Sequence, residues 1–127
     1  MIKETLKYVD KVWGEEVVIV NSDKYCCKML LVNQDAVSST HRHLKKTETF
    51  YTLEGYGLLI VEGKQHILAP FTRPKTIEAG ERHSYKALSP LIILEVSTTH
   101  SDDDVERFAL SKEYDEECKV FRGDKDV

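Results

Sequence analysis

Four residues in two distant segments have the side chains and the spacing of a metal site. His41 and His43 lie two residues apart, and Glu48 follows five residues later. Successive side chains of an extended strand alternate between its faces, so His41 and His43 project from one face and can reach the same cation. A short turn then brings the next strand back with Glu48 beside them. His83 follows a glycine turn at Gly80 and supplies a third imidazole.

Three imidazoles and one carboxylate suit a borderline divalent metal ion such as Zn, Mn, Fe, Co or Ni. This donor set leaves coordination positions open for water or substrate, which is typical of catalytic sites. A histidine pair on a strand is by itself usually solvated or hydrogen-bonded. The prediction of a metal site therefore depends on the glutamate and the third histidine.

Two further ionisable side chains alternate with apolar residues. Lys28 shares a face with Leu30, and Glu95 shares a face with Ile93. If these faces line the interior, Lys28 needs an anionic partner, either Glu95 or a substrate phosphate, because an unpaired buried charge is costly. Otherwise Lys28 lies at a strand edge in solvent and Glu95 is a charge on the outer face. The alternation is compatible with both arrangements.

The segments that must position these residues are predicted to be short β-strands. Runs rich in β-branched and aromatic residues are separated by turn residues such as Asn, Asp and Gly, without a helical period between them. This spacing predicts an all-β sandwich or barrel. The predicted strands are Glu16–Val20, Tyr25–Val32, Glu48–Leu53, Tyr56–Glu62, Gln65–Leu68, Lys75–Glu78, His83–Ala87 and Leu91–Ser97.

The pattern changes after the last of these strands. Ser101 and the three aspartates that follow it predict a helix start, because serine caps helices and acidic residues favour the positive end of the helix dipole. Val105, Phe108 and Ala109 then have the i, i+3, i+4 spacing of an amphipathic helix. We therefore expect a short C-terminal helix lying on the barrel, followed by a charge-rich tail.

Composition sets the broad class. The 127 residues are 41% hydrophobic and 31% charged, with a net charge of -4 and no basic stripe, which argues against a nucleic-acid partner. No apolar run is long enough to span a membrane, and no signal-peptide core follows Met1. Cys26, Cys27 and Cys118 are an odd number of cysteines, so a disulfide framework is not expected and a cytoplasmic location is.

The histidine-containing segments resemble those of a known family. His41-x-His43-x4-Glu48-x6-Gly55 is similar to the first cupin motif, and Gly80-x2-His83 resembles the core of the second. In three positions the chain departs from these motifs: Asp35 replaces the opening glycine of the first, Glu78 replaces a proline before Gly80, and Ala87 replaces an asparagine after His83. None of the three is a metal ligand, so the departures affect turn geometry and substrate identity.

Other segments resemble the mannose-6-phosphate isomerase (type II)-like branch of cupins. Trp13-Gly14-x-Glu16 looks like its WG-x-E signature, and Lys28 is similar to its lysine on the following strand. Glu95-Val96 with Asp103-Asp104-Val105-x-Arg107 resembles its C-terminal ending. The resemblance extends from Trp13 to about Arg107. It implies one cupin domain over residues 1–127, with a double-stranded β-helix (jelly-roll) barrel at about 13–98 and the helix and tail at 101–127.

The resemblance also implies an activity. This branch would bind a divalent metal ion through His41, His43, Glu48 and His83 and interconvert an aldose and a ketose, as free sugars or sugar phosphates, through an enediolate. The expected proton-transfer base is Glu95 or Lys28, with Arg107 as a second-rank catalytic candidate whose alternative is a salt bridge to a nearby aspartate. The expected substrate-binding residues are Tyr85, which shares the face of His83, Lys46 at the pocket mouth, and His100. The alternative for Lys46 is a solvated charge in a turn, and the alternative for His100 is a structural role.

Two other functions fit the same scaffold. One is an iron-dependent dioxygenase that uses the same ligands, and the other is a non-catalytic cupin that binds a sugar or another metabolite. A homodimer is also expected, because Tyr51 and Leu53 point away from Glu48 and would form an apolar outer face. The alternative is that the N-terminal segment around Val12 and Trp13 covers this face.

Overall fold

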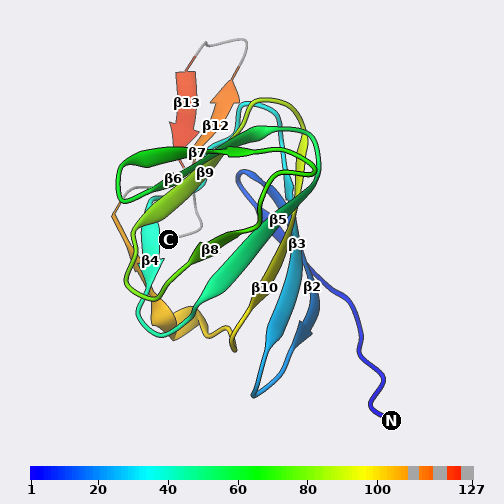
Figure 1. Cartoon of the computed structure of the whole chain (residues 1–127). Coiled ribbons are helices and arrows are strands. Elements are labelled where there is room, and N and C mark those ends of the chain that lie inside the picture. The colour runs from blue at the N-terminus through cyan, green and yellow to red at the C-terminus, as the bar shows by residue number, and fades with distance from the viewer. Residues whose placement is uncertain (109–111, 116–119, 124–127) are drawn as a thin grey trace.

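Two antiparallel sheets form a β-barrel (Figure 1). A computed structural model of the chain describes residues 1–108, 112–115 and 120–123. One sheet has the order β1 (Lys7–Lys11), β2 (Gly14–Asn21), β3 (Cys26–Val32), β10 (Leu91–Ser97), β5 (Glu48–Glu54) and β8 (Lys75–Ile77). The other has the order β11 (Val105–Arg107), β4 (His41–His43), β9 (His83–Ala87), β6 (Gly57–Val61) and β7 (Lys64–Leu68). A separate hairpin pairs β12 (Lys112–Asp115) with β13 (Val120–Gly123).

The all-β barrel predicted from the sequence is confirmed. Every predicted strand is present with its ends shifted by at most two residues, and β9 and β10 have the predicted bounds. Strand β1 was not predicted. Among the described residues, no helix is long and apolar enough to cross a membrane.

The predicted C-terminal helix is wrong for the described residues. Asp102–Asp104 form only a single 3-10 turn, η1, and Val105–Arg107 form strand β11. Val105 pairs with His43 and Arg107 with His41, so β11 provides hydrogen-bond partners for the backbone groups on the free edge of β4. This pairing overrides the helical spacing of Val105 and Phe108, because local propensity is weak compared with tertiary hydrogen bonding. Ala109 lies outside the described residues.

The inner face of the barrel changes from apolar to polar along each strand. On β3 the inward side chains run from Val32 and Leu30 to Lys28, and on β10 from Ile93 to Glu95. Register brings the polar ends together, because Glu95 pairs with Lys28. One end of the barrel is thus an apolar core and the other holds ionisable groups. The core residues are Trp13, Leu30, Val32, Ala36, Phe50, Leu59, Leu68, Ile77, Tyr85, Ala87, Leu91 and Ile93.

One departure from the motif and one open alternative, the position of Trp13, have a clear structural outcome. Asp35, which replaces the glycine of the first motif, adopts a left-handed φ of 67°, a conformation that Asp tolerates better than most residues. Trp13 does not cover the outer face of the sheet. It is 4% exposed and packs edge-on against Tyr85 inside the barrel, with ring centroids 5.5 Å apart.

Candidate metal centre and substrate cavity

Three histidines meet at the polar end of the barrel. His41 and His43 come from β4 and His83 comes from β9, where it is the ladder partner of His41. One ring nitrogen from each of the three lies within 4.8 Å of the others. The glycine turn before β9 is tied to β4, because the N–H of Gly80 donates to the carbonyl oxygen of His43 at 2.7 Å. Gly80 has a φ of +89°, which explains the use of glycine there.

Backbone carbonyls orient two of the imidazoles. Nδ1 of His41 lies 2.8 Å from the carbonyl oxygen of Ser39, and Nδ1 of His83 lies 3.0 Å from that of Glu81. A carbonyl oxygen can only accept, so Nδ1 of each ring carries a proton. In His41 this leaves the Nε2 lone pair available for a metal ion, whereas Nε2 of His83 lies 2.8 Å from Oε1 of Glu48. Backbone carbonyls orient metal-binding histidines in this way.

Glu48 lies against this cluster from β5. Its Oε1 is 2.8 Å from Nε2 of His83, and its Oε2 is 3.7 Å from Nε2 of His43 and 3.0 Å from Nζ of Lys46. The four residues predicted as ligands therefore gather at one place. Glu48 contacts two of the histidines and is also held by the Lys46 ammonium group.

The donor atoms fit a divalent metal ion. Nδ1 of His43 and Nε2 of His83 are buried without a well-directed hydrogen bond among the described residues, although His83 is close to Glu48. Such unpaired buried atoms are costly unless a ligand satisfies them. Three imidazoles and a carboxylate are the donors that Zn, Mn, Fe, Co or Ni accept.

The electrostatics of His41 and His43 favour the neutral, metal-binding form of the ring. Burial lowers the pKa of His41 to about 3 and that of His43 to about 2, with further lowering from His83 and Lys46 respectively. Both rings are therefore neutral near pH 7, as coordination requires. Burial also acts to lower the pKa of His83, but its contact with Glu48 outweighs burial and raises that pKa above the usual value. Burial acts against the charged form of Glu48, but contacts with His83 and Lys46 hold the pKa of its carboxyl group below the usual range.

Lys46 is buried rather than exposed at the pocket mouth. Its ammonium nitrogen lies 3.0 Å from Glu48, 3.3 Å from Glu95 and 3.1 Å from Nδ1 of His100, and the residue is 3% exposed. The two carboxylates already neutralise it. Lys46 is therefore placed to hold the acidic residues of the site, and its charge is not free for a substrate phosphate.

Glu95 faces the cavity from β10. Burial, followed by the charge of Glu48, raises its pKa to about 7, against the opposing effect of Lys46 and Lys28. A carboxyl group with such a pKa exchanges protons readily near neutral pH.

Lys28 also points inward, but its partner differs from those expected. Nζ of Lys28 lies 2.8 Å from Oε1 of Glu16, the glutamate of the WG-x-E segment. Lys28 is the ladder neighbour of Glu95, yet its ion pair is with Glu16. Of the two arrangements that the sequence left open, the interior one is found.

The other three predicted residues line the same cavity. Tyr85 is buried beside Trp13 and Phe50. Arg107 lies on β11 and donates from Nη1 to Oγ of Ser39 at 2.7 Å, close to His41. Nδ1 of His100 accepts from the ammonium group of Lys46, and its Nε2–H donates to Oδ1 of Asp102 at 2.9 Å.

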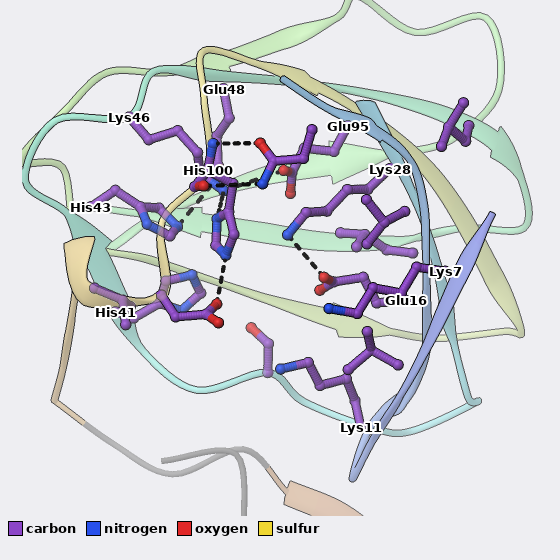
Figure 2. Close-up of a pocket in the computed structure, with 18 of the residues that line it drawn as sticks. Lys7, Lys11, Glu16, Lys28, His41, His43, Lys46, Glu48, Glu95 and His100 are labelled. Carbon is purple, nitrogen blue, oxygen red and sulfur yellow. Dashed lines mark hydrogen bonds and ion pairs between the residues drawn. The ribbon is translucent and has the colours of Figure 1, made fainter. Parts of the chain in front are cut away.

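The cavity has a volume of about 770 Å³ and is shown in Figure 2. This volume is in the range of small-molecule sites. Lys7 and Lys11 of β1 also line the wall of the cavity, and they were not predicted from the sequence. Their signal was the period-two spacing of Lys7, Val9 and Lys11, which places all three on one face of a strand.

The barrel, the two histidine segments and the cavity between the sheets define the chain as a cupin. It belongs to the family described as "Mannose-6-phosphate isomerase C-terminal", which it matches over residues 2–110. A comparison with curated proteins gives no match.

Solved structures share the fold at low sequence identity. KdgF from Halomonas sp. superimposes with a TM-score of 0.69 and 17% identity, over 76% of this chain and 89% of that one. The Streptomyces nucleoside dehydratase Pac13 gives a TM-score of 0.71 and 16% identity, over 85% and 91%. Oxalate decarboxylase from Bacillus subtilis gives 0.67 and 16%, over 81% of this chain but 30% of that one.

Proposed function

We propose that the chain is a metal-dependent aldose–ketose isomerase that acts on a sugar or a sugar phosphate. The observation that carries this proposal is that Glu95 lines one cavity together with His41 and His43, within a chain of the mannose-6-phosphate isomerase C-terminal family. A divalent cation bound by His41, His43, Glu48 and His83 supplies Lewis-acid polarisation of the sugar carbonyl.

Glu95 is the proton-transfer base in this proposal. Its carboxylate takes the proton from the carbon next to the carbonyl and returns it to the neighbouring carbon. Lys46, 3.3 Å away, holds the carboxylate in place. The ion pair of Lys28 with Glu16 makes Lys28 the weaker candidate, because its ammonium group is already engaged.

The remaining cavity residues orient the sugar. Arg107 offers N–H donors at the wall near the histidines, and Tyr85 and His100 line the same cavity. None of these residues has to form a covalent bond to substrate. The reaction needs a base that moves a proton between adjacent carbons, transfer of the hydroxyl proton to the former carbonyl oxygen, and stabilisation of negative charge on oxygen.

Elemental analysis combined with a screen of sugar phosphates tests the proposal. We expect the purified protein to hold a transition-metal ion and to exchange a substrate C1 or C2 proton with deuterated solvent. His41→Ala/His43→Ala should lose both properties, whereas His66→Ala, an exposed histidine on β7, should retain both. Turnover that survives loss of the ion contradicts the proposal, and sugar binding without proton exchange favours a non-catalytic cupin.

A further inference from the structure

One wall of the cavity is built by β1 and carries charge that the proposed chemistry does not use. Lys7, Val9 and Lys11 line the cavity, whereas Tyr8 and Asp10 lie on the exposed face of the strand. Strand β1 is an edge strand paired only with β2, where Lys7 lies opposite Val18 and Lys11 opposite Gly14. Figure 2 shows Lys7 and Lys11 entering the cavity from a different side than His41 and His43.

The deeper cations of the cavity are already neutralised. Lys28 pairs with Glu16 at 2.8 Å, and Lys46 pairs with Glu48 at 3.0 Å. In the part of the chain that the structure describes, Lys7 and Lys11 make no ion pair.

Arg107 adds a third cation to the cavity. Its hydrogen bond to a side chain goes to the neutral hydroxyl of Ser39, at 2.7 Å, and it forms no ion pair with a described carboxylate. The cavity therefore contains three cations that form no ion pair with a described carboxylate, although the charge of Lys11 acts on Asp102, in a chain whose net charge is -4. Like charges in a cavity with low-dielectric walls focus their field on an anion that enters it.

We propose that Lys7 and Lys11, together with Arg107, bind the anionic group of the substrate, a phosphate monoester or a carboxylate, while the rest of the substrate reaches the histidine cluster. Ammonium and guanidinium groups form charge-assisted hydrogen bonds with oxyanions. These residues take the anion-binding role that the sequence suggested for Lys46, because the charge of Lys46 is balanced by Glu48 and Glu95. This proposal rests on the proposed function for the orientation of the substrate. The binding of an anionic group by these three cations is a separate claim and is tested by itself.

Calorimetric titration of the zinc-loaded protein with three sugars tests this site. Mannose 6-phosphate carries a phosphate, glucuronate carries a carboxylate, and mannose is neutral. Wild type should bind at least one of the anionic sugars about tenfold more tightly than mannose, and the tighter of the two identifies the preferred oxyanion. Lys7→Gln/Lys11→Gln should lose about tenfold of that affinity and leave mannose binding within twofold.

A matched pair of lysines provides the control. Lys24 and Lys64 are exposed and do not line the cavity, so Lys24→Gln/Lys64→Gln removes the same charge elsewhere and should leave the preference unchanged. Affinity for the anionic sugar should fall with added salt in wild type and less steeply in Lys7→Gln/Lys11→Gln. Thermal melts of both variants confirm that each is folded.

Two results overturn the anion site: equal affinity of Lys7→Gln/Lys11→Gln and wild type for both anionic sugars, or an equal loss in the control pair. These results are distinct from failure of the isomerase proposal. A lysine-dependent preference without turnover retains the anion site and removes the isomerase. Turnover of mannose 6-phosphate that is unaffected in Lys7→Gln/Lys11→Gln removes the anion site alone.

Discussion

Glu95 is held between opposing influences at the centre of the site. Burial favours its neutral form, whereas the ammonium groups of Lys46 and Lys28 favour the carboxylate, and its pKa is raised to about 7. Small changes of pH near neutrality therefore change its charge, which is a requirement for a base that both removes and returns a proton.

Replacing this carboxyl group should abolish proton transfer. We expect Glu95→Gln to lower kcat by about a hundredfold or more, the usual contribution of a positioned general base. Because the base must be deprotonated, kcat/KM of wild type should rise with pH up to about 7 and level off above it. Steady-state rates across pH check both points, and a Glu95→Gln variant with near-normal kcat would assign the proton transfer to another group.

Residue types at the site could be predicted from the sequence, but their partners could not. Strand alternation left both an inward and an outward position open for Lys28 and Glu95, and both lie inward. The partner of Lys28 is Glu16, however, and Lys46 is buried rather than exposed. Partner choice depends on the register between β2 and β3 and on the course of the β4–β5 turn, and alternation along one strand contains neither.

At the scale of elements, the segment after β10 has an unexpected role. It contains the η1 turn, in which Asp104 receives three backbone N–H groups of the turn between β4 and β5. Leu44 donates to its carbonyl oxygen at 3.0 Å, Lys45 to Oδ1 at 2.9 Å and Lys46 to Oδ2 at 3.0 Å. Asp104 thereby fixes the connection between His43 and Glu48.

Removal of this carboxylate should loosen the metal centre. We expect Asp104→Ala to lower the free energy of unfolding by about 2 kcal/mol, because two N–H groups lose a charged acceptor. Metal affinity should fall about tenfold, as for other groups that orient ligands. Asp103→Ala, at an exposed neighbouring position, should change neither. Urea unfolding and metal titration measure these effects, and equal behaviour of the two variants would contradict the role of Asp104.

Two of the elements that sequence reasoning missed, β1 and β11, are strands at the edge of a sheet. Strand β1 has the exposed and charged sequence KYVDK, and β11 has three residues within a segment of helical spacing. Each is stabilised by hydrogen bonding to a neighbour, β2 or β4, rather than by its own hydrophobic pattern. The interior strands β9 and β10 were predicted with the correct bounds. Alternate burial imposes a clear period on β10, whereas β9 is buried at four of its five positions.

At the scale of the whole molecule, the outer face of the larger sheet remains apolar. Leu94 is flanked by Met29 and Tyr51 across the ladders, and Leu53 and Val96 are 44% and 49% exposed. A contiguous apolar face of this kind is typical of a self-association surface.

This face supports the prediction of a homodimer. We expect sedimentation equilibrium to show a dimer for wild type and a monomer for Leu53→Lys, because a charge placed in an apolar interface loses its hydration. Ile67→Lys changes an exposed residue of β7 in the other sheet and should remain dimeric. A monomeric wild type, or a dimeric Leu53→Lys, would show that this face is not the interface.

The separation of an apolar core from an ionisable end has a consequence for how the protein matures. The core closes around Phe50, Leu59 and Ile93, none of which depends on a bound cation. We therefore expect the chain to acquire its shape before it acquires its ion, and to exchange one ion for another without unfolding. The metal supply of the cell, rather than the folding reaction, would then decide which ion the finished protein carries.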